Sequence, residues 1–131
     1  MIVVDASVLL ELLLNTDAAA RVAAKLFDRA EALHAPHLLD LEIAQALRRY
    51  ERAGTLATSR AEEAFEDLAD LQIARYPHGF LLPRVWTLRR NVTAYDAAYL
   101  ALAEALGATL VTRDAALASV PGHNARVEVI R

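Results

Sequence analysis

The chain has 131 residues, of which 56% are apolar, and a formal net charge of −3. This length and apolar content are sufficient for one compact domain spanning residues 1–131. The absence of cysteine excludes disulfides, thiolate metal sites and cysteine nucleophiles, leaving carboxylates and four histidines as candidate ligands. A negative net charge also argues against a broadly basic nucleic-acid binder, so any RNA or DNA contact requires a local basic patch.

Neither apolar run near the N-terminus has the form of a targeting or membrane segment. The opening run at residues 2–4 is interrupted by Asp5, and the run at residues 8–14 contains Glu11. Both are too short and too charged for a signal sequence or membrane span, so we expect a cytoplasmic protein without membrane contact.

The first half of the chain alternates short β-branched runs with helical periods. The run MIVVD ends at a carboxylate and is typical of a strand buried on both faces. Ser7 and Asp17 are suited to cap the two helices that follow, and Gly54 is suited to end the third. The predicted elements are a strand at 1–5, helices at 7–14 and 18–30, a weak strand at 31–35 closed by Pro36, and a long helix from 38 to Gly54.

The second half continues the alternation. Ser59 and Glu62 have the spacing of a capping box, and Gly107 follows a strongly apolar helical stretch. The predicted elements are a helix at 59–71, a strand at 73–76, a turn at 77–79, helices at 80–90 and 94–106, a strand at 109–113, a helical turn at 115–119 and a strand at 127–130. This order predicts an α/β fold with a central, mostly parallel sheet, helices on both faces and right-handed crossovers.

Four acidic residues are predicted to meet at one edge of this sheet. Asp5 ends the first strand, Glu42 lies early in the helix after Pro36, Asp96 starts the helix at 94–106, and Asp114 follows the strand at 109–113. The helix at 94–106 should rise about 20 Å, and the strand at 109–113 should run back about 17 Å. Asp96 and Asp114 should therefore lie at the same edge. Doubly wound folds bind ligands at this edge.

Close carboxylates repel unless they share protons or bind a cation. An all-oxygen set without cysteine or organised histidine suits Mg²⁺ or Mn²⁺. Such an ion would polarise a phosphoryl oxygen, activate a water and stabilise the leaving oxygen. The pattern therefore predicts metal-dependent phosphodiester hydrolysis.

Each acid also has a purely structural interpretation. Asp5, Asp96 and Asp114 could cap helices or complement helix dipoles, and Glu42 borders a polar face where it could be solvated. Asp40 is the second candidate for the site acid of this helix, behind Glu42, because it shares a helical row with apolar residues. The histidines lack ligand spacing, and surface or hydrogen-bonding roles are expected for them. The arginine groups 48/49/52 and 84/89/90 could be solvated helix faces or could contact RNA phosphates.

Three stretches together resemble PIN-domain ribonucleases, and more narrowly the VapC-type toxins of bacterial toxin–antitoxin pairs. They are VVDASVLLELL, APHLLDLEIAQALRR and TAYDAAYLALAEALGATLVTRDAAL. The resemblance implies an α/β/α sandwich that cleaves single-stranded or looped RNA with Mg²⁺ or Mn²⁺. It also implies a homodimer and inhibition by a cognate antitoxin protein.

Carried over residue by residue, the resemblance assigns catalytic and metal-binding roles to the four acids, with Asp5 and Asp96 as the expected direct ligands. The full acidic set is Asp5, Glu42, Asp96 and Asp114. Ser7 and Thr112 match hydroxyl positions beside the metal, where they would orient water or a carboxylate.

Two alternatives stay open at the level of sequence. One is a catalytically inactive PIN-like module that binds RNA or protein, for which partner binding without nuclease activity would be the signature. The other is a receiver-like signalling domain with a phospho-accepting aspartate, although a lysine expected after a late strand is Arg113 or absent. An acetyl-phosphate adduct would favour the second alternative.

Overall fold

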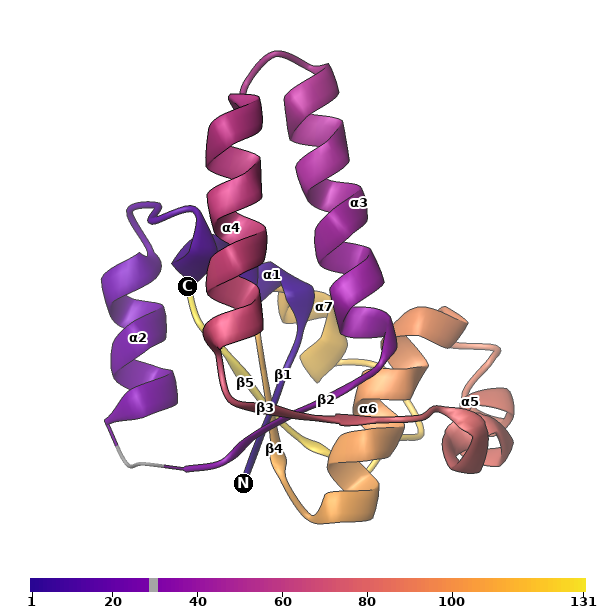
Figure 1. Cartoon of the computed structure of the whole chain (residues 1–131). Helices are drawn as coiled ribbons and strands as arrows, with labels where there is room; N and C mark the ends of the chain where they lie inside the picture. Colours follow the sequence, from indigo (N-terminus) through magenta and orange to yellow (C-terminus); the bar gives the residue numbers. More distant parts are fainter. Residues whose placement is uncertain (29–30) are drawn as a thin grey trace.

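A five-stranded parallel sheet forms the centre of the protein (Figure 1). The computed structural model describes residues 1–28 and 31–131. The strand order is β3-β2-β1-β4-β5, and every neighbouring pair is parallel. The strands are β1 (Ile2–Val4), β2 (Leu33–Pro36), β3 (Ile73–Tyr76), β4 (Thr109–Thr112) and β5 (Arg126–Val129).

Helices cover both faces of the sheet. They are α1 (Ala6–Leu13), α2 (Ala19–Phe27), α3 (Leu38–Arg52), α4 (Thr58–Asp70), the 3₁₀ turn η1 (Gly79–Leu81), α5 (Leu82–Thr87), α6 (Ala94–Leu106) and α7 (Ala115–Ala118). Crossovers between parallel strands are right-handed, so connections running toward β3 lie on one face and those running toward β5 on the other. The predicted α/β/α sandwich is therefore confirmed, and α3 and α4 extend from it as a helical hairpin (Figure 1).

The most deeply buried helix is α6, which contacts β1, β2 and β4. Its residues 97–103 are all buried, because the sheet covers one side of the helix and neighbouring helices cover the rest. Four of these seven residues are alanine, and small side chains allow the helix to approach the strands closely. Within the described residues, no helix is both long and apolar enough to cross a bilayer.

Several predicted boundaries agree with the structure and others need correction. The strand at 73–76 and the helix at 94–106 are confirmed, and Gly107 ends the helix at φ 63°. The predicted helix at 80–90 is instead η1 followed by α5, with Gly79 in η1 and not in a free turn. Pro83 opens α5 because proline lacks an N–H and cannot continue the preceding turn.

Three predicted helix caps were wrong. Asp5, and not Ser7, caps α1, with its side chain accepting a bond from the Val8 N–H. Ala18 and Ala57 precede α2 and α4 without side-chain caps, so Asp17 and Ser59 do not cap. The helix predicted to reach residue 30 ends at Phe27, and residues 29 and 30 lie outside the described part of the chain.

Candidate active site

Asp5 lies at the point where the strand order of the sheet reverses, between β1 and β4. Val4 pairs with Val111, so the next residue along β1 meets Thr112 at the end of β4. The side chain of Asp5 is only 7% exposed. A nearly buried carboxylate requires hydrogen-bond donors, and the sequence supplies three of them.

The three donors fix both oxygens of the Asp5 carboxylate. Ser7 Oγ donates to Oδ1 at 2.6 Å, the Val8 N–H donates to Oδ1 at 3.2 Å, and Thr112 Oγ1 donates to Oδ2 at 2.5 Å. Ser7 Oγ also accepts from the Arg113 N–H at 3.0 Å, which ties α1 to the end of β4. Both hydroxyls expected beside the metal thus orient a carboxylate. One lone pair, on Oδ2, is left for a further ligand.

Glu42 comes to this edge from the second turn of α3. Its Oε1 accepts a bond from the Tyr99 hydroxyl at 2.5 Å, which joins α3 to α6. Burial raises the pKa of Glu42, the Tyr99 bond lowers it, and the charges of Asp96 and Asp5 raise it again. Burial and the bond to Glu42 also raise the pKa of Tyr99, so its phenol stays protonated and acts as a donor.

Asp96 and Asp114 are held by the helices that they begin. The Asp96 N–H donates to Thr93 Oγ1 at 3.2 Å, which gives the first turn of α6 its cap. Asp114 caps α7 by accepting from the Ala116 N–H at 2.9 Å, and its own N–H donates to Thr112 Oγ1. The structural interpretation of Asp114 therefore holds, but capping uses one oxygen and leaves the other accessible.

The acids influence one another electrostatically. Burial raises the pKa of Asp5, and the nearby charge of Asp96 raises it further, while hydrogen bonds from Ser7, Thr112 and Val8 oppose the rise. Burial and the charge of Asp114 raise the pKa of Asp96 in the same way. The structure thus brings the four predicted acids to one edge, where like charges are close enough to interact.

The donor chemistry of this edge fits a hard divalent cation. Carboxylate oxygens are the ligands that Mg²⁺ and Mn²⁺ prefer, and a cation would relieve the repulsion among them. Across residues 1–28 and 31–131, no three His, Cys, Asp or Glu side chains are close enough to bind one ion together. Mg²⁺ commonly retains several waters and takes one or two carboxylates, so two acids such as Asp5 and Asp96 would be sufficient in number.

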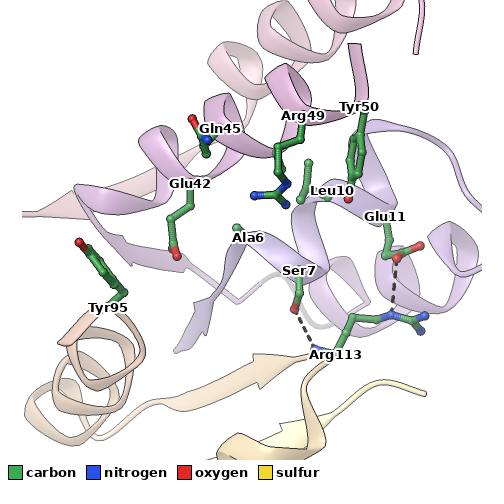
Figure 2. A pocket seen from close by; sticks show the side chains of 11 residues that line it. Ala6, Ser7, Leu10, Glu11, Glu42, Gln45, Arg49, Tyr50, Tyr95 and Arg113 are labelled. Carbon is green, nitrogen blue, oxygen red and sulfur yellow. Dashed lines mark hydrogen bonds and ion pairs between the residues drawn. The ribbon is translucent and has the colours of Figure 1, made fainter. Parts of the chain in front are cut away.

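A pocket of about 670 Å³ adjoins the acids between α1 and α3 (Figure 2). Glu42 and Ser7 form its border with the acid cluster, whereas Asp5, Asp96 and Asp114 lie outside its lining. The other lining residues are Ala6, Leu10, Glu11, Gln45, Ala46, Arg49, Tyr50, Tyr95 and Arg113. Of the four acids, Glu42 thus opens onto the hollow, and Ser7, which bonds to Asp5, also lines it.

Residues 2–123 match the family model of the PIN domain. The chain belongs to the PIN-domain family. It is 42% identical over 130 residues to the VapC ribonuclease Mb0985 of Mycobacterium bovis, covering 99% of this chain and 98% of that protein. It is 40% identical to ribonuclease VapC1 of Mycobacterium tuberculosis, covering 98% and 97% of the two chains. The resemblance to PIN-domain ribonucleases of the VapC type is therefore confirmed.

Two solved structures share the fold. PAE2754 from Pyrobaculum aerophilum superposes with a TM-score of 0.69 at 27% identity, covering 98% of this chain and 83% of that one. VapBC2 from Rickettsia felis, solved bound to a DNA fragment from its promoter, gives a TM-score of 0.70 at 14% identity and covers 98% of both chains. The second likeness concerns the fold alone.

Several competing candidates in this PIN domain have structural roles elsewhere. Asp40 forms a bidentate ion pair with Arg75 at 2.7 and 2.9 Å. His34 is buried and bonds through Nδ1 to the Tyr76 hydroxyl at 2.7 Å, as expected of a hydrogen-bonding histidine, and burial lowers its pKa. Arg89 stacks on Trp86 with its Cζ 4.5 Å from the ring centre.

Sequence reasoning missed two contributors to the site of this PIN domain. Tyr99 is one of them. Its ring is buried, but its hydroxyl also positions Glu42. Its spacing of three residues from Asp96 on one helix was a usable signal, because such residues share a helical face. Arg113 is the other. It lines the pocket and pairs with Glu11 at 3.7 Å, and both contacts arise only in the tertiary structure.

Proposed function

We propose that this PIN domain is a Mg²⁺- or Mn²⁺-dependent endoribonuclease and the toxin of a toxin–antitoxin pair. The observation that carries the proposal is the gathering of Asp5, Glu42 and Asp96 at one sheet edge, with the pKa of all three raised. Membership of a family whose named relatives are ribonucleases supports the same reaction. The proposal places the protein in the cytoplasm, with its RNA substrate.

The roles of the residues follow from how firmly each one is held. Asp5 is fixed by three donors and is the most rigid ligand available, and the charge of Asp96 is close enough to influence it. Asp5 and Asp96 would hold Mg²⁺ or Mn²⁺, which would polarise a phosphoryl oxygen and activate a water. Glu42, with its raised pKa and its Tyr99 donor, is suited to accept a proton from that water. Asp114 adds negative charge that strengthens cation binding.

Cleavage of a fluorophore–quencher RNA by the purified protein tests the proposal directly. We expect cleavage with Mg²⁺ or Mn²⁺ and loss of cleavage with EDTA, restored by excess metal. Activity that persists in EDTA would rule out the metal mechanism. Absence of cleavage under every metal, together with retained partner binding, would instead favour the inactive binding module.

Two acids of α3 provide a matched pair of variants. Glu42→Gln removes a carboxylate at the cluster, whereas Asp40→Asn removes one that is paired with Arg75 away from it. We expect the first variant to lose cleavage and the second to retain it. Equal loss in both variants would show that negative charge on α3, and not position in the cluster, controls activity.

The proposal includes a cognate antitoxin and a homodimer. Four large apolar side chains are more than half exposed around η1, α5 and the start of α6: Phe80 at 56%, Leu82 at 53%, Trp86 at 67% and Tyr95 at 66%. This surface supports self-association, because exposed aromatic groups are enriched at interfaces. Light scattering of the parent and Leu82→Glu proteins tests the dimer. Suppression of RNA cleavage by the co-expressed antitoxin tests the other partner.

A further inference from the structure

Arg49 is positioned to act in the pocket beside the acid cluster. It follows Glu42 by seven residues, and the pocket residues of α3 are Glu42, Gln45, Ala46, Arg49 and Tyr50. This spacing places them on one face of the helix, two turns long. Figure 2 shows the Arg49 side chain reaching back from α3 toward the middle of the pocket, above Ala6 and Leu10. That direction is normal for a long helical side chain and carries the charge toward Glu42.

Among the described residues, Arg49 forms no hydrogen bond or ion pair with another protein group, unlike Arg113, the other arginine of the pocket. Arg113, on the opposite wall of the pocket, pairs with Glu11 and donates to the Ile130 carbonyl. Arg75 and Arg84 form bidentate pairs with Asp40 and Glu104. Of the two pocket arginines, Arg49 is thus the exposed one whose guanidinium is not held by another described protein group.

The electrostatics of the cluster make such a cation useful. A strand of RNA that approaches four carboxylates on a protein of net charge −3 meets repulsion at the point of cleavage. Arg49 can offset that repulsion and hold a phosphate bidentately in a fixed register, because guanidinium matches phosphate geometry. We infer that Arg49 binds a phosphate of the RNA strand next to the scissile one, so that the pocket between α1 and α3 accommodates the strand beside the cleavage centre. The inference rests on the proposed ribonuclease function.

Binding and cleavage of a single-stranded RNA by Arg49→Ala test this role, with Arg48→Ala as the control. Arg48 is the neighbouring residue with the same charge and helix, but it faces a different hollow, toward α4. In an Asp96→Asn background that holds RNA uncut, we expect Arg49→Ala to weaken RNA binding about tenfold. The slope of log affinity against log salt should fall by about 0.7, the value for one lost single-strand phosphate contact.

In the active background, Arg49→Ala should raise KM about tenfold and change kcat less than about threefold, since a neighbouring phosphate is bound equally in ground and transition states. Arg49→Lys should recover part of the loss, because lysine keeps the charge without the bidentate geometry. Arg48→Ala should match the parent in both assays.

Three results would overturn the inference. RNA affinity and salt slope in Arg49→Ala equal to those of the parent would show that no phosphate is bound there, even if binding to a protein partner were weakened. An altered metal requirement with unchanged KM would assign Arg49 to the carboxylates instead of the RNA. A parent protein that binds no RNA at any salt concentration would overturn the ribonuclease proposal as well, which distinguishes the two failures.

Discussion

The acid cluster of this PIN domain and the single carboxylate of Glu104 lie in opposite electrostatic environments. In the acid cluster, burial and like charges raise the pKa of Asp5, Glu42 and Asp96. At the other end of α6, Glu104 accepts bonds from Arg84 at 2.8 and 3.0 Å and from the Asn124 N–H at 2.6 Å. These bonds, led by that of Arg84, lower the pKa of Glu104.

The contrast separates acids that stabilise the fold from acids that do not. Glu104 is paired and connects α6 to α5 and to the segment before β5, so its negative charge favours folding. The clustered acids carry charge at a cost to folding, which is characteristic of sites that await a cation or substrate. Folding stability and RNA cleavage should therefore respond oppositely to substitutions in the two groups.

The largest effect is expected for cleavage in Asp96→Asn. Losing the proposed metal ligand should reduce the cleavage rate by about 10³-fold, which corresponds to several kcal/mol of transition-state stabilisation. The melting temperature of the apo protein should stay the same or rise, because one repelling charge is gone. Parallel measurement of cleavage rate and thermal unfolding checks both expectations. A clear fall in melting temperature would assign Asp96 to helix capping instead.

Glu104→Gln should reverse that pattern. Removing the charged partner of Arg84 should lower the free energy of unfolding by about 1–2 kcal/mol, allowing for the partial exposure of Arg84. For a domain of this size the melting temperature should drop by about 4–8 °C. RNA cleavage at a temperature where the variant is folded should be unchanged. Substantial loss of cleavage there would contradict the separation between the two groups.

The pH dependence of stability should also differ between the groups. The folded pKa of Glu104 lies below its ordinary value of 4.5, so its stabilisation is present above pH 4.5 and is lost as the pH falls through the folded pKa. The folded pKa of Asp96 lies above 3.8, so its ionisation costs stability as the pH rises through that value.

Chemical denaturation from about pH 3 to 7 measures both trends. The free energy of unfolding of Glu104→Gln should approach that of the parent toward acid pH. Any gain in the free energy of unfolding of Asp96→Asn should grow toward neutral pH. If the free energy of unfolding changed with pH in the same way for Glu104→Gln and Asp96→Asn, the two acids would not differ in electrostatic environment.

The smallest effect is expected for Tyr99→Phe, which removes only the donor to Glu42. Glu42 is half-buried, so water can replace the hydroxyl at a cost of about 0.5–1.5 kcal/mol. Because the Tyr99 bond lowers the pKa of Glu42, the acidic limb of the cleavage profile should move to higher pH. Tyr76→Phe, which removes a hydroxyl bonded to His34 outside the pocket, is the control. If both variants showed the same dependence of cleavage rate on pH, Glu42 would not be the group that accepts the proton.

Much of the fold could be predicted because its signals are local. The β-branched run that became β1, the apolar period of α6 and the left-handed Gly107 depend on backbone preferences of neighbouring residues. Helix caps were less predictable. Ser7, Asp17 and Ser59 all have suitable side chains, but packing set where the helices begin, and at α2 and α4 it placed an alanine at the cap.

By itself, the sequence determined the α/β alternation, the family and the placement of four acids at strand ends or early in helices, because each depends on residue order along the chain. Only the tertiary structure decided which groups those acids face. The β1–β4 register brings Thr112 to Asp5, the packing of α3 on α6 brings Tyr99 to Glu42, and Arg113 pairs with Glu11. These contacts join residues distant in sequence, and their energies depend on burial and distance, which emerge only when the elements pack together.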